Sequence, residues 1–157
     1  MRKLFCWFAI VLLLITSPPQ LGFAVKTEME GASFSVIPGV SWGDEIEHVK
    51  TIIGHPRERT LTDVVTYLEF ETSFETKTAT TQMFFTQNRL SKILFLFMLP
   101  HEGFKEDLYA ALESEFGRCT LNLEEPDVVN WMLKDGTFVE LSSNRNAITL
   151  IFDHMDE

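Results

Sequence analysis

Residues 39–56 read GVSWGDEIEHVKTIIGHP, and this stretch decides the fold because both ends of a short helix are written into it. Ser41 can cap the first turn, and Asp44 three residues later gives the spacing of a capping box. Gly54 supplies the left-handed residue that ends a helix, and Pro56 prevents the helix from resuming. The apolar residues of one helix face recur at Ile46, Val49 and Ile53. The sequence therefore predicts a short amphipathic helix here.

A second helix is predicted from about residue 102 to residue 116, where large apolar residues recur every four positions and Gly117 follows. Alternation and β-branched or aromatic content predict strand segments around both helices. The predicted strands are 33–37, 64–71, 81–86, 90–98, 128–134, 137–142 and 147–153. Residues 55–59 are expected to form a loop and residues 72–80 a polar connection.

The two halves of the chain align with each other. Residues 63–68 (DVVTYL) match residues 127–132 (DVVNWM), each at the start of the strands that follow a helix. We therefore expect an α+β fold of two helix-plus-three-strand units, about 33–99 and 100–157. Together they would form a single domain over 33–157, an antiparallel sheet with both helices on one face. The alternative is a chance similarity between two α+β segments.

The N-terminus has the pattern of an export signal. Arg2 and Lys3 precede an apolar run over residues 4–15, and residues 22–24 give a small-x-small cleavage site. We expect a signal peptide over 1–24, cleaved after Ala24, and a flexible leader over 25–32. The predicted location is periplasmic or secreted, with no stable membrane anchor after cleavage because no Cys stands at the cleavage point. An uncleaved signal anchor is the alternative.

The charge balance excludes one class of partner. The formal net charge is −10, and removal of Arg2 and Lys3 with the signal peptide makes the chain more acidic still. Binding to a phosphate backbone needs clusters of Lys and Arg, so nucleic acid is not an expected partner. Cys119 is then the remaining thiol, expected to be a small buried hydrophobe; a catalytic thiolate or an intermolecular disulfide are the alternatives.

The segment 39–56 resembles a known family. Its Gly39-Val40-Ser41 opening, mid-helix Val49 and closing residues 52–56 are similar to those of the SmpA/OmlA (BamE-type) outer-membrane proteins. The tandem arrangement resembles the β-lactamase-inhibitor-protein-like fold, and Trp42-Gly43 resembles small exported bacterial proteins. The resemblance implies a non-catalytic, protein-binding role in the bacterial envelope. The chain has no lipobox Cys, which argues against membrane anchoring, and its second unit lacks the Gly-x-Ser opening. Fold and compartment are carried over from the resemblance, and binding residues are not.

Sites for metals and catalysis are weakly supported by the sequence. Asp44 and His48 are four residues apart, but further ligands at a recognised spacing are missing. The acidic residues Glu124, Glu125 and Asp127 lack the spacing of a calcium loop and are expected to form a solvated turn. Linear signatures of hydrolases, nucleotide-binding loops or dinucleotide-binding folds are also missing. We therefore expect neither a metal nor a cofactor, and we do not expect an enzyme.

Aromatic side chains are the better candidates for a binding site. Tyr67 and Trp131 take the same position in the alignment of the two halves, on the strand face that carries Glu69 and Glu71. If that face is open, both could anchor a protein interface. The alternative for Trp131 is a place in the core. Trp42 is the third candidate, with packing at the start of the helix as its alternative.

We therefore expect an exported, non-catalytic module that binds another envelope or extracellular protein. A small-molecule or metal-ion binding protein, or an enzyme without a linear motif, is the alternative function.

Overall fold

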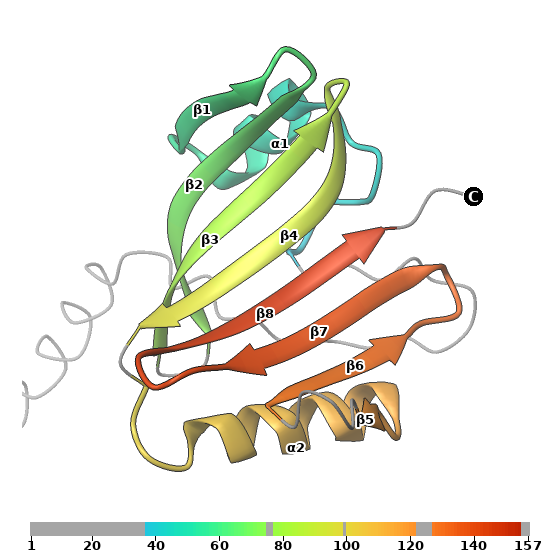
Figure 1. The fold of residues 1–157 in the computed structure, drawn as a ribbon. Coiled ribbons are helices and arrows are strands. Elements are labelled where there is room, and N and C mark those ends of the chain that lie inside the picture. The colour runs from blue at the N-terminus through green and yellow to red at the C-terminus, as the bar shows by residue number, and fades with distance from the viewer. Residues whose placement is uncertain (1–36, 75–76, 99, 122–126, 155–157) are drawn as a thin grey trace, which may run out of the picture.

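The computed structural model describes residues 37–74, 77–98, 100–121 and 127–154 (Figure 1). These residues form two helices and an eight-stranded sheet. The predicted signal peptide, leader and first strand lie outside the described residues, apart from Ile37. The elements in chain order are α1 (Ile46–Ile53), β1 (Arg57–Thr62), β2 (Val65–Phe74), β3 (Lys77–Thr86), β4 (Arg89–Met98), α2 (Phe104–Phe116), β5 (Thr120–Leu121), β6 (Val128–Met132), β7 (Thr137–Ser143) and β8 (Ala147–His154). Neither described helix is long and apolar enough to span a bilayer.

The sheet is antiparallel throughout, with the strand order β1-β2-β3-β4-β8-β7-β6-β5. Its centre is the pairing of β4 with β8, whose register runs from Lys92 opposite Asp153 to Met98 opposite Ala147. The strands before β4 and before β8 therefore extend the sheet outward in opposite directions (Figure 1).

The predicted α+β class is confirmed, but the division into two helix-plus-three-strand units is wrong. Four strands follow each helix: β1 to β4 follow α1, and β5 to β8 follow α2. Residues 57–59 of the expected loop belong to edge strand β1, whose six residues are all exposed, so it has no apolar alternation to reveal it. The expected polar connection 72–80 is mostly strand, because β2 extends to Phe74 and β3 begins at Lys77.

The structure differs from the prediction at the start of helix α1 and agrees with it at the end of the helix. Its N-cap is Glu45 and not Ser41, and the Ser41 backbone N–H instead donates to Asp44 Oδ2 at 2.8 Å. Its end is as expected: Gly54 adopts φ 87°, and its N–H donates to Lys50 O at 3.0 Å.

The core lies between the helices and one face of the sheet. One row of buried cross-strand neighbours crosses this face through β2, β3, β4, β8, β7 and β6. Its residues are Leu68, Met83, Ile93, Phe152, Val139 and Trp131. Ile46 and Val49 of α1 belong to the same core cluster. Phe104 and Phe116 of α2 pack their rings edge-on against the strand residues Phe97 and Phe152. In Figure 1, α1 lies behind the β1–β4 part, and α2 lies beside β5 and β6.

Candidate binding face of the sheet

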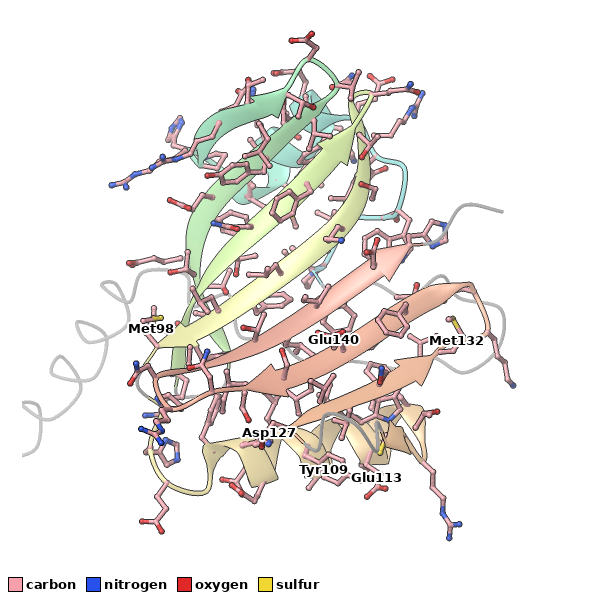
Figure 2. All side chains as sticks on the ribbon, viewed as in Figure 1. Met98, Tyr109, Glu113, Asp127, Met132 and Glu140 are labelled. Atoms are coloured by element: carbon pink, nitrogen blue, oxygen red, sulfur yellow. The ribbon has the colours of Figure 1, made fainter. Side chains whose placement is uncertain are left out.

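The other side of the sheet, turned away from this core, is called the open face below. Because side chains alternate along a strand, the pairing registers place its residues in three rows across β2, β3, β4, β8, β7 and β6. The first row is Tyr67, Phe84, Lys92, Asp153, Phe138 and Met132; the second is Glu69, Gln82, Leu94, Ile151, Glu140 and Asn130; the third is Glu71, Thr80, Leu96, Thr149, Ser142 and Val128. Figure 2 shows Glu140 on β7 and Met132 on β6.

Apolar side chains on the open face form a small central patch at Leu94, Leu96 and Ile151, and further apolar groups lie toward the ends of strands β2, β3, β4 and β6. The rings of Tyr67 and Phe84 stack with centroids 5.3 Å apart. Leu94 and Ile151, which face each other across the central strand pair, are half-buried. Met98 and Met132 are 59% and 62% exposed. Apolar groups thus remain in contact with water on a face that neither helix covers.

Two of the four carboxylates in the rows of the open face, Glu69 and Asp153, have partners among the described residues. Lys92 Nζ lies 2.6 Å from Asp153 Oδ2 across the β4–β8 pair. Gln82 Nε2 donates to Glu69 Oε2 at 2.9 Å, and Arg59 Nη2 lies 3.9 Å from Glu69 Oε1. These pairs fix polar side chains beside the central apolar patch.

Glu140 is the exception in the middle row. It lies half-buried between Ile151 on β8 and Asn130 on β6, and none of its described contacts is a hydrogen bond or an ion pair from its side chain. Asn130 Oδ1 is buried and also has no hydrogen-bond partner. Among the residues that the structure describes, these two neighbouring acceptors on the open face therefore have no donor.

Of the two aromatic residues predicted to share the open face, the structure places Tyr67 there and Trp131 elsewhere. Trp131 is 3% exposed, its Nε1–H donates to Gly117 O at 2.9 Å, and its ring lies 6.1 Å from that of Tyr109. Its placement on the open face is wrong, and it belongs to the core. The alignment of the two halves was shifted by one residue, which moves a side chain to the opposite face of a strand. Met132 is the residue that shares a row with Tyr67.

Trp42 lies on the helix side of the sheet. Its Nε1–H donates to Thr137 Oγ1 at 3.0 Å, and its ring stacks on His154 with centroids 5.5 Å apart and an interplanar angle of 7°. It is part-buried and packs against the core. This arrangement is the packing role that the sequence left as its alternative.

The candidate metal ligands do not converge. His48 Nε2 lies 3.9 Å from Asp44 Oδ2, and no group of three or more His, Cys, Asp or Glu residues within the described ranges could hold a metal ion. Glu124 and Glu125 lie outside the described residues. Asp127 pairs with Lys105 Nζ at 3.2 Å.

A polar cluster joins the end of α2 to the residues that follow it. The Tyr109 hydroxyl lies 3.4 Å from Cys119 Sγ and donates to Glu113 Oε1 at 3.2 Å. The hydrogen bond with Cys119, burial, and the hydrogen bond with Glu113 raise the pKa of Tyr109 to about 12. The phenol is therefore protonated at neutral pH. Cys119 itself is half-buried, as a small residue in the packing beneath α2.

Sequence reasoning missed most residues of the open face. Phe84, Leu94, Phe138 and Ile151 lie within segments that it identified as strands, but apolar residues at consecutive positions concealed which of them face outward. Comparison of the chain with protein-family models, with curated proteins and with solved structures finds no match.

Proposed function

We propose that this chain is an exported, non-catalytic module that binds another envelope or extracellular protein on the open face of its sheet. The observation that carries the proposal is the set of half-buried and exposed apolar side chains on that face, which lie among charged and polar residues. Neither helix covers it, and the core occupies the opposite face.

The composition of the open face supports a protein partner. Interfaces combine an apolar centre with aromatic residues and methionine, surrounded by a polar rim. Tyr67 stacked on Phe84, with Met98 and Met132 exposed, fits this pattern. An open sheet face also suits another protein surface better than a small molecule, which is usually enclosed in a concavity.

The N-terminal sequence supports the proposed export of the chain. The basic residues, apolar run and small-x-small site at residues 1–24 are those of a secretory signal. We propose that cleavage near Ala24 releases the chain into the periplasm or the medium.

Site-specific photo-crosslinking in the cells that produce the chain tests the proposal. Benzoylphenylalanine at Met132 or Met98 should give a crosslinked product of defined mass, because both side chains are exposed on the open face. The matched control is the same group at Glu106, which is exposed on α2. Equal crosslinking from Glu106, or none from either methionine, would contradict the proposed binding face.

A further inference from the structure

At one place on the open face, two polar side chains lack a hydrogen-bond donor among the described residues. Asn130 and Glu140 are cross-strand partners, so their side chains leave the sheet about 5 Å apart. Among the described residues, no donor reaches the Glu140 carboxylate, and the buried Asn130 Oδ1 has no partner. A half-buried carboxylate without a donor is unfavourable relative to one that is fully hydrated.

A comparison of Glu140 with Asp153 indicates which kind of group Glu140 lacks. On strands β6, β7 and β8, the described open face carries Glu140 and Asp153. Asp153 is neutralised by Lys92 at 2.6 Å, whereas no Lys or Arg of the described ranges lies within ion-pair distance of Glu140. The missing group is therefore a cationic donor.

We infer that Glu140 and Asn130 receive an arginine side chain of the protein partner; this inference rests on the proposed function. A guanidinium presents several N–H groups in one plane, so it can donate to a carboxylate and to a neighbouring amide oxygen together. Because Oδ1 of Asn130 is buried in the unbound chain, the inference requires its amide to rotate about the last torsion when the guanidinium arrives.

The surroundings of Glu140 also fit arginine. Ile151 lies opposite Glu140 on β8 and offers an apolar surface to the aliphatic stem. Phe138, two residues before Glu140 and on the same face, offers a ring to the guanidinium plane. The net charge of −10 favours the approach of a basic partner over long range.

Selection of a phage-displayed random dodecapeptide library on the full chain tests the inference. We expect enrichment of peptides that carry an arginine next to apolar residues. Synthetic copies should bind about tenfold more weakly to Glu140→Gln, and peptides with citrulline in place of the arginine should show a similar loss. Asn130→Asp should strengthen binding because it adds a second carboxylate, and this variant supports the inference even if Glu140→Gln is unstable.

Glu71→Gln is the matched control, because Glu71 lies on the same face at β2, four strands from β7. Equal weakening by both Gln variants, enrichment without arginine, or no enrichment would overturn the inference. Competition by free agmatine at peptide concentration would instead indicate a small-cation site and would also overturn it. Peptides that crosslink from benzoylphenylalanine at Met132 but tolerate Glu140→Gln would reject the arginine site and keep the proposed function. Selected peptides that bind the chain but do not crosslink from Met132 would contradict both the arginine site and the proposed binding face.

Discussion

Trp42 and Thr137, which are 95 positions apart in the sequence, are joined by a hydrogen bond of 3.0 Å from the indole Nε1–H to Oγ1. The bond ties the segment before α1 to the start of β7. The Trp42 ring also covers His154 at the end of β8. The first half of the chain thus contacts strands β7 and β8 of the second half from the helix side.

Replacing Trp42 by Phe should destabilise the chain by about 1–3 kcal/mol, because the buried Thr137 hydroxyl loses its donor. Urea denaturation of Trp42→Phe, Thr137→Val and the double variant measures the coupling between them. We expect a coupling energy of about 1 kcal/mol. Additive effects of the two substitutions would show that the hydrogen bond contributes nothing.

Trp131→Ala should cost about 3–5 kcal/mol of unfolding free energy, the range for a large buried aromatic residue. Tyr67→Ala, on the open face, should cost clearly less because the ring is only part-buried. Thermal and urea unfolding of the two variants give the comparison directly. Similar losses for both would mean that Tyr67 contributes to the core as much as Trp131 does.

The buried hydroxyls of Thr72 and Thr81 lie 2.7 Å apart and should behave as a unit. Either single change to Val leaves one hydroxyl without its partner and should cost about 1–3 kcal/mol. The double change to Val should be close to neutral, because it removes both polar groups together. Urea midpoints of the three variants decide the matter, and a double variant as unstable as the sum of the singles would be the contrary result.

Tyr109 should ionise near pH 12, since its hydrogen bonds and burial favour the neutral phenol. The raised pKa also means that this contribution to stability is fully present below about pH 10, the ordinary value of an unfolded tyrosine, and is lost as the pH rises through 12. Absorbance at the phenolate band, taken as the difference between the wild type and Tyr109→Phe, follows this residue alone. Cys119→Ala should lower the midpoint, because it removes the largest cause of the shift; an unchanged midpoint would contradict that assignment.

The sequence predicted the parts of the fold that have strong local signals. Gly54 and Gly117 end the two helices where expected. Strand β1 was missed because all its residues are exposed, and the ends of β2 and β3 were missed because threonine-rich strands resemble polar loops.

The candidate site was harder to predict because it depends on register. Tyr67 was placed correctly relative to Glu69, which shares its face. Trp131 was misplaced because the alignment of the two halves is off by one residue, and no local feature of 128–132 reveals this. The missing donor at Glu140 depends on pairing between β6 and β7 in three dimensions, so a linear reading could not find it.

The central pairing of β4 with β8 has a consequence for biosynthesis. Strand β4 is complete at Met98, but its partner begins only at Ala147, so the ribosome must add residues 99–146 before the sheet can close. During that interval the edge of β4 is unpaired, and its run of Leu and Phe side chains can associate with other nascent chains.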